Sequence, residues 1–234
     1  GFWSLATPAI WTEIRHGGYD LLWLHGYAYA ANLLALAAAR MSGVKVALRA
    51  ESHLLLYRPG LRRVLRNGLI AALFRQFDWF FAIGSRNADY LRYLGVRASR
   101  IRRVPYAIDN ERFGAARDAK DEPSRPVALF AAKMVNRKDP LSFLEAARLL
   151  EERGINVTLR MAGSGPMESQ LRERAKSLGL RNIEFTGFVN QGAMPALLAA
   201  ADIFVATSDW EPWGLVVNEA MAAGLAIVAS DDMG

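Results

Sequence analysis

The sequence predicts an α/β protein made of two domains, each with a parallel β-sheet. In both halves of the 234-residue chain, short apolar runs typical of buried strands alternate with longer runs whose apolar residues recur at helical spacing. Such alternation predicts a parallel sheet covered by helices on both faces. A charged stretch with two prolines, residues 112–126, predicts a linker between a first domain of residues 1–111 and a second of residues 127–234.

The elements follow from the same pattern, taken along the chain. In the first half we expect strands at residues 19–25, 44–49, 79–83 and 101–104, and helices at 28–41, 61–77 and 85–94. In the second half we expect strands at 127–132, 156–162, 182–185, 202–207 and 226–229, and helices at 140–153, 167–178, 192–200 and 213–223. Ligands of such sheets bind at the carboxyl ends of the strands, so the loops that follow the strands should carry the site.

The composition indicates a globular chain without a disulfide framework. Hydrophobic residues make up 52% and charged residues 22%, and the chain has no cysteine for a disulfide or a metal site. This fits a reducing compartment, and no signal peptide is visible, so we expect a cytoplasmic protein. Residues 21–39 carry no formal charge and are nearly long enough to cross a bilayer, but His25, Gly26 and Asn32 favour a strand, a turn and a helix instead.

Positive charge is concentrated in the first half of the chain. Residues 1–115 contain 16 Lys and Arg against 7 Asp and Glu, a net charge of +9, whereas residues 116–234 contain 13 against 16. This asymmetry indicates contact with an anionic membrane or an anionic acceptor, and a plain solvated surface is the alternative. The basic residues expected there are Arg58, Arg62, Arg63 and Arg66, each contributing about 1 kcal/mol near an anionic surface.

The most informative stretch runs from Ser208 to Gly224 and contains two glutamates separated by seven residues. Glu211 stands just before a predicted helix, whose N-terminus offers free N–H groups and a positive dipole end that suit a phosphate. Glu219 lies inside this apolar helix, where a charge needs a partner such as a pair of ligand hydroxyls. For a glutamate pair taken alone, the simpler interpretation is a balanced helix dipole and a half-exposed side chain.

The whole string resembles the Glu-x7-Glu signature of glycosyltransferase family 4, which are retaining sugar-nucleotide enzymes with the GT-B fold. The similar features are Ser208, then Glu-Pro-aromatic-Gly-Leu, and then Glu-Ala-Met-Ala-x-Gly. The resemblance implies two Rossmann-like parallel-sheet domains that face a central cleft. It extends from His25 to Gly234 and implies that both domains are incomplete, so that the chain is an internal fragment of the family's catalytic unit.

The resemblance assigns roles within this string. It places Glu211 at the hydroxyls of the transferred sugar and Glu219 at the ribose. It places the backbone N–H groups of Gly214 and Leu215 at the phosphates of the donor.

Two lysines follow the first predicted strand of the second half. Cations at the end of one strand can grip a diphosphate and stabilise it as it leaves, whereas two solvated lysines are the alternative. Lys133 and Lys138 resemble the family's basic pair, although Ala132 and Asp139 stand where the family has glycines. The departing diphosphate can itself take the acceptor's proton. The sequence has no Asp-x-Asp, so we expect no catalytic metal and no other cofactor.

A glycine loop and an aromatic segment complete the predicted donor site. Gly163 and Gly165 frame a turn between a strand and a helix, and Glu168 replaces the third glycine of a dinucleotide fingerprint, which disfavours a dinucleotide oxidoreductase. The turn resembles the one that lines the family's nucleotide pocket, and a tight turn that simply needs glycine is the alternative. Phe188 and Val189 match the family segment that faces the base, and a core aromatic beside a turn is the alternative.

One candidate lies in the first half. His25 ends an apolar strand and resembles the family's strand-end histidine, which points into the cleft near the transferred sugar; a satisfied core histidine is the alternative. Residues 49–53 end the next strand and should also face the cleft, without an assigned role.

The resemblance implies that the protein is a retaining glycosyltransferase that moves a sugar from a nucleoside diphosphate sugar to a hydroxyl acceptor. The resemblance implies a role in the synthesis of polysaccharide, glycolipid or another cell-surface glycan. The expected partners are the nucleotide-sugar donor, a glycan or lipid-linked acceptor and the anionic inner face of a membrane, with no nucleic acid. Two alternatives stay open, a nucleotide-sugar epimerase on the same fold and an inactive nucleotide-sugar-binding module.

Overall fold

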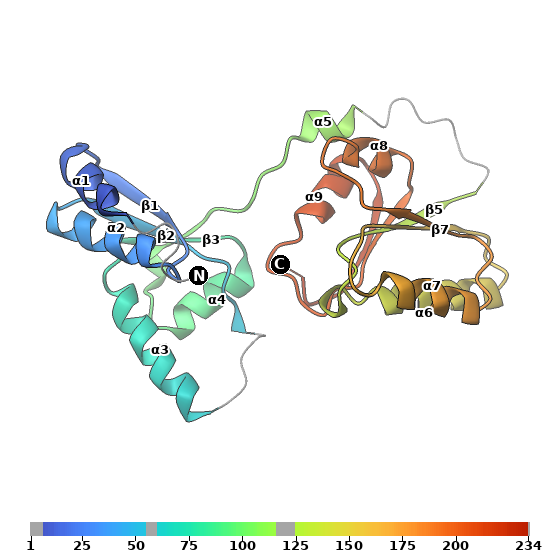
Figure 1. The fold of residues 1–234 in the computed structure, drawn as a ribbon, viewed down its shortest axis with the longest axis horizontal. Coiled ribbons are helices and arrows are strands. Elements are labelled where there is room, and N and C mark those ends of the chain that lie inside the picture. Colours follow the sequence, from blue (N-terminus) through green and yellow to red (C-terminus); the bar gives the residue numbers. More distant parts are fainter. Residues whose placement is uncertain (1–6, 55–59, 116–124, 234) are drawn as a thin grey trace. The chain divides into compact units, whose positions relative to one another are not determined.

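The computed structural model describes residues 7–54, 60–115 and 125–233, which form two compact units. The first unit extends to Tyr106, and the second begins at Ala107. Each unit contains one parallel β-sheet packed against helices (Figure 1). The predicted fold class, two Rossmann-like α/β domains, is confirmed.

The first unit has four parallel strands in the order β1-β2-β3-β4. The strands are β1 (Leu21–His25), β2 (Lys45–Arg49), β3 (Trp79–Ala82) and β4 (Ile101–Arg103), and the helices are α1 (Pro8–His16), α2 (Ala30–Met41), α3 (Leu61–Phe74) and α4 (Ser85–Tyr93). Helix α1 was not predicted. Its signal is Thr7, whose hydroxyl accepts a hydrogen bond from the Ala9 N–H as an N-cap, followed by Pro8 at the first helical position.

Residues 21–39 form a strand, a turn and most of a helix, as predicted. Strand β1 ends at His25, and Gly26 turns the chain with a φ of 78°, a conformation that favours glycine. Helix α2 then begins at Ala30. Within the described ranges, no helix is long and apolar enough to cross a membrane.

The helices of the first unit gather on one face of its sheet, which corrects the expectation of helices on both faces. The sheet contributes alternate residues such as Leu24, Val46 and Phe80 to a single core cluster with α2, α3 and α4. On the opposite face of β1, Leu21 and Trp23 stay more than 40% exposed, at 44% and 43%. The reason is the strand order: successive strands advance in one direction, so right-handed crossovers place every connecting helix on the same side.

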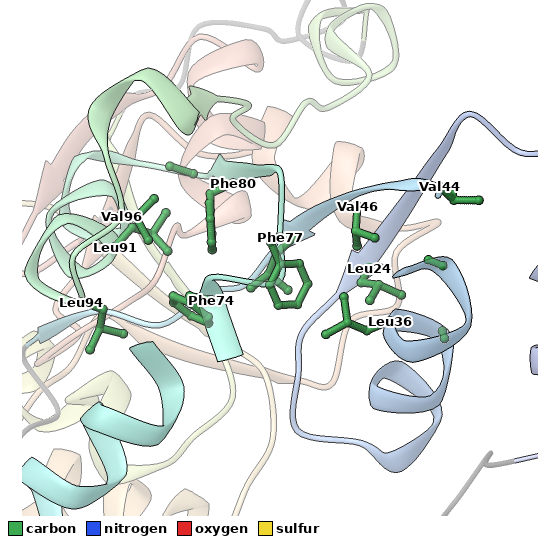
Figure 2. Close-up of a cluster of buried hydrophobic side chains, with 14 of the residues drawn as sticks. Leu24, Leu36, Val44, Val46, Phe74, Phe77, Phe80, Leu91, Leu94 and Val96 are labelled. Atoms are coloured by element: carbon green, nitrogen blue, oxygen red, sulfur yellow. The ribbon is translucent and has the colours of Figure 1, made fainter. Parts of the chain in front are cut away.

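Three phenylalanines anchor this core (Figure 2). Phe74, Phe77 and Phe80 are each at most 2% exposed, and their ring centroids lie 5.1 to 6.2 Å apart. These separations are those of tilted and edge-to-face aromatic pairs, which add to the energy of burial. The cluster joins the end of α3 to strand β3 and so fixes the position of that helix.

The second unit has five parallel strands in the order β7-β6-β5-β8-β9. The strands are β5 (Val127–Ala131), β6 (Thr158–Ala162), β7 (Ile183–Gly187), β8 (Ile203–Ala206) and β9 (Ala226–Ala229), and the helices are α5 (Asn110–Gly114), α6 (Pro140–Glu152), α7 (Glu168–Ser177), α8 (Met194–Ala199) and α9 (Leu215–Ala222).

The strand order of the second sheet reverses at β5, and its helices therefore cover both faces. The chain runs from β5 outward to β6 and β7, and then returns to place β8 on the other side of β5. Helices α6 and α7 form one core cluster with the sheet, and α5, α8 and α9 form another (Figure 1). Ligands of such sheets bind at the carboxyl ends of the strands where the order reverses, here β5 and β8.

The predicted linker begins too early. Residues 110–114 form helix α5, capped by Asp109, whose carboxylate accepts a hydrogen bond from the Arg112 N–H. Phe113 is 2% exposed and belongs to the core cluster with Ala220 of α9, so this segment is part of the second unit. Because charged residues surround Phe113 in the sequence, local composition did not predict that Phe113 is buried in the second unit. Most of the remaining predicted linker, residues 116–124, lies outside the described residues.

We expect Phe80→Ala to lower the free energy of unfolding by about 3–5 kcal/mol, because it leaves a cavity between two packed rings. Urea unfolding followed by circular dichroism measures the change. The control is Met41→Ala at a side chain that is 66% exposed, which should change stability by less than about 0.5 kcal/mol. Equal effects of the two substitutions would contradict the central position of Phe80.

Candidate active site

The loops that follow β5 and β8 bring a carboxylate and two cations together in the second unit. Glu211 follows β8, and its Oε2 accepts a hydrogen bond from Arg137 Nη1 at 2.9 Å and another from the Lys138 ammonium. The side chains of Lys138 and Glu211 are only 16% and 14% exposed. The structure therefore joins Lys138 and Glu211, two predicted catalytic residues that are far apart in the sequence.

Arg137 is a third member of this cluster that the sequence analysis left without a role. Its guanidinium lies 4.6 Å from the centre of the Trp210 ring and donates to the Trp210 carbonyl oxygen at 3.3 Å. A guanidinium stacked on an aromatic face is held in orientation, so it can present a fixed donor to Glu211. The only hint in the sequence was its place between two lysines that had been assigned to phosphate.

Hydrogen bonds to and from neighbouring residues fix the loop that carries Lys138. The Thr207 hydroxyl, directly after β8, lies within hydrogen-bond distance of the carbonyl oxygens of Lys138 and Asp139, at 3.0 and 2.7 Å. Asp139 has a φ of 41° and caps α6 by accepting from the Ser142 N–H at 3.3 Å. The Asp209 N–H donates to the Arg137 carbonyl oxygen at 3.0 Å. The ends of β5 and β8 are thus tied together through their loops.

The loop between Glu211 and α9 is shaped by a glycine. Gly214 has a φ of 81° and precedes α9, which begins at Leu215 rather than at the predicted residue 213. A β-carbon at Gly214 would lie 2.7 Å from the end of the Met233 side chain. The Glu211 N–H donates to the Asp232 carbonyl oxygen at 3.0 Å, which fastens the loop to the segment after β9. The first turn of α9 is consequently presented at the carboxyl end of β8, where the N–H groups of Gly214 and Leu215 were predicted to meet phosphates.

Glu219 is buried in α9, with 7% of its surface exposed, and it has a partner in the chain. Gln191 donates from Nε2 to Glu219 Oε1 at 3.0 Å, and Arg112 donates to the Gln191 carbonyl oxygen. The prediction that this glutamate needs a partner agrees with the structure. The Gln191 amide lies in the loop before α8 and was not recognised in the sequence.

The predicted nucleotide loop lines a cavity of about 340 Å³ at the carboxyl ends of β5 and β6. The cavity is lined by Ala131, Ala132, Lys133, Ala162, Gly163, Ser164, Phe188, Val189 and Met194. Four of these, Lys133, Gly163, Phe188 and Val189, are predicted site residues. The Phe188 ring is 75% exposed, so it is not a core aromatic but a side chain available for stacking.

The two glycines of this loop are required by close backbone contact. A β-carbon at Gly163 would lie 2.0 Å from the Ala132 carbonyl oxygen, and one at Gly165 would lie 2.4 Å from the Met134 carbonyl oxygen. The Met134 N–H donates to the Ser164 carbonyl oxygen at 3.0 Å. The β6–α7 loop thus rests directly on the segment after β5 that carries Lys133.

His25 belongs to the first unit and ends β1, as predicted. Its imidazole is exposed and stacks on Trp23 with a centroid separation of 5.2 Å, so it is not a satisfied core histidine. Beside it in the sheet, Arg49 ends β2 with its guanidinium 4.1 Å from the Tyr106 ring centre. Tyr106 donates to Glu51, and burial together with the Glu51 carboxylate raises the pKa of Tyr106 above its ordinary value.

A parallel sheet with a reversed strand order, a cation–carboxylate cluster and a glycine-lined cavity at the strand ends defines the second unit as a Rossmann-like binding domain. The family "Glycosyl transferases group 1" matches residues 114–234, and "Glycosyltransferase Family 4" matches residues 2–112. The chain therefore belongs to the family "Glycosyl transferases group 1". The two matches meet inside α5, close to the division between the units.

Relatives of known name agree with this assignment. Mannosylfructose-phosphate synthase of Agrobacterium fabrum is 29% identical over 175 residues, which cover 68% of this chain and 38% of that protein. The putative colanic acid biosynthesis glycosyltransferase WcaL of Escherichia coli is 30% identical over 166 residues, which cover 68% of this chain and 40% of WcaL. The chain thus spans about two fifths of the length of these relatives.

A solved structure shows the same fold. The structure of HepE from Anabaena in complex with UDP and glucose matches with a TM-score of 0.69 and 20% identity, over 100% of this chain and 66% of HepE. The fold of the present chain is accordingly that of the GT-B glycosyltransferases.

We expect Gly163→Ala to destabilise the second unit by about 1–3 kcal/mol and to reshape the cavity, because Gly163 has a φ of 130° and no space for a β-carbon. Urea unfolding and cavity binding of a nucleotide measure the two effects. Gly68→Ala in α3 is the control, since a β-carbon there meets nothing within 4 Å and should stabilise the helix slightly. A Gly163→Ala variant as stable as the parent would refute the contact with Ala132.

Proposed function

We propose that the complete protein is a retaining glycosyltransferase that transfers a sugar from a nucleoside diphosphate sugar to a hydroxyl acceptor. The observation that supports this most is the cluster of Lys138, Arg137 and Glu211 between the ends of β5 and β8 in a member of the family. An acceptor that is a glycan or a lipid-linked glycan fits relatives such as the putative colanic acid glycosyltransferase. The reaction then takes place in the cytoplasm, at the inner face of the membrane, without nucleic acid.

The donor is proposed to bind across the carboxyl end of the second sheet. Phe188 and Val189 meet the base beside the turn of Gly163 and Gly165, and Glu219 accepts hydrogen bonds from the ribose. Gln191 already donates to one oxygen of Glu219, so it orients the carboxylate for that contact. The N–H groups of Gly214 and Leu215 meet the phosphates at the start of α9.

The two carboxylate oxygens of Glu211 are proposed to bind different partners. Arg137 and Lys138 both contact Oε2. We assign Oε1 to the sugar hydroxyls, because a carboxylate has acceptor capacity on both oxygens. Lys138 is thereby held near the donor before the reaction, which avoids reorganisation when charge develops.

In the transfer step, the bond between the anomeric carbon and the diphosphate oxygen breaks, and a bond to the acceptor oxygen forms on the same face of the sugar. Lys133 and Lys138 stabilise the negative charge of the leaving diphosphate. The acceptor's proton passes to that leaving group, so no side chain has to act as base. His25 is assigned a place near the transferred sugar, and transfer without a metal or other cofactor remains a prediction.

The direct test is a binding screen of UDP-, GDP- and ADP-sugars against the complete protein by calorimetry, followed by incubation with acceptors. We expect one nucleotide to bind in preference to the others and the product to keep the anomeric configuration of the donor. An epimerised nucleotide sugar, or binding without turnover, would overturn the proposal in favour of an epimerase or an inactive binding module.

Kinetics should separate the roles of Glu219 and Lys138. Glu219→Ala should raise the donor KM more than it lowers kcat, because a ribose contact is similar in the ground and transition states. Lys138→Ala should lower kcat by about 10²–10³, because its attraction to the diphosphate grows as the bond breaks.

Steady-state rates of the complete enzyme provide the measurement, and Lys176→Ala on the exposed face of α7 is the matched control. A normal kcat in a folded Lys138→Ala enzyme would remove the leaving-group assignment. A collapse of kcat in both variants with unchanged nucleotide affinity would instead place Glu219 at the reacting bond.

A further inference from the structure

Helix α3 of the first unit carries an apolar face that is exposed to solvent. The exposed side chains are Leu61 at 76%, Val64 at 66%, Leu65 at 64% and Leu69 at 74%. Their spacing of three or four residues places them on one side of the helix, and the small residues Gly68 and Ala72 lie on the same side. Four large aliphatic side chains together form an unusual surface for a soluble domain.

The opposite side of α3 is the one that packs on its unit. Asn67 and Phe74 are buried, and Ile70 and Leu73 pack against the core cluster. The beginning of α3 points away from the sheet of the first unit, whereas its end reaches the phenylalanine cluster (Figure 1). The core contacts of α3 therefore do not require the exposed leucines.

The charges on α3 and on the residues that flank it in the sequence have one sign. Arg62 and Arg66, one turn apart, lie exposed along one edge of the face. No Asp or Glu occurs between residues 52 and 77, and five arginines do, Arg58, Arg62, Arg63, Arg66 and Arg75. Arg58 lies outside the described residues, and Arg63 donates to the Tyr93 hydroxyl at 3.2 Å.

We propose that α3 docks on an anionic lipid bilayer, with Leu61, Val64, Leu65 and Leu69 inserted among the acyl chains near the headgroups. Arg62 and Arg66 then lie at the level of the lipid phosphates. An amphipathic helix with an apolar face and an arginine-rich edge is suited to the plane of a membrane interface.

Charge favours a membrane over a second copy of the chain as the occupant. Two copies that met through this face would bring their arginines together, with no carboxylate from residues 52–77 to pair with them. An anionic bilayer satisfies both the apolar and the basic groups. The proposal rests on the membrane location given under the proposed function, and it names the surface of the first unit that makes this contact.

The test is flotation of the complete protein with vesicles of phosphatidylcholine alone or mixed with phosphatidylglycerol. We expect clear preference for the anionic vesicles. Leu65→Glu combined with Leu69→Glu should lower the partition coefficient by at least about tenfold, because charged groups do not enter the acyl region. Arg62→Gln combined with Arg66→Gln should lower it by about tenfold and flatten its dependence on salt.

Met41→Glu, at a side chain 66% exposed on α2, is the matched control and should bind vesicles like the parent protein. Nucleotide binding and thermal unfolding, which should be unchanged in all variants, separate a docking defect from misfolding and from failure of the proposed transferase function. Unchanged vesicle binding by the leucine variant, or equal binding to both kinds of vesicle, would overturn the proposal. So would a parent protein that ignores vesicles but forms a dimer that the leucine substitutions dissociate.

Discussion

The reversal of strand order at β5 is the constraint on which the candidate site depends. Right-handed crossovers keep α6 and α7 on one face of the second sheet while the chain moves outward from β5, and they put α9 on the other face after the return to β8. The loops after β5 and β8 consequently start side by side and lead to opposite faces. Lys138 and Glu211 meet because they lie on these two loops.

A carboxylate with little access to water is stable there only because cations compensate for its lost hydration. Glu211 meets both Arg137 and Lys138. The Trp210 ring, and the Thr207 hydroxyl beside the carbonyl oxygens of Lys138 and Asp139, limit how far these groups can move. Removing one charged side chain from such a group lowers stability by more than the ion pair contributes, because the remaining buried charge then has no partner. The same rigidity suits a site in which charge develops during the reaction.

The first unit follows a different physical logic. Its strand order does not reverse, so its described helices share one face of the sheet, and one of them presents aliphatic side chains and arginines to the surroundings. Aliphatic side chains that stay exposed to water add nothing to the stability of the folded unit, because only apolar surface removed from water stabilises it. Such a surface is better explained by a contact that the complete protein makes than by the stability of the unit.

Much of this could be predicted from local pattern. The alternation of apolar runs was enough to place most strands and helices, and the string around Glu211 and Glu219 was enough to indicate the family, because strand period, helix caps and signature residues are properties of neighbouring positions. Helix α1, the helical start of the expected linker at Phe113 and the one-sided packing of the first sheet were missed. Arg137 and Gln191 also escaped notice as the partners of the two glutamates. The signal of α1, Thr7 followed by Pro8, is local and was overlooked. Each of the other features depends on which distant segments touch, and strand order and packing decide that.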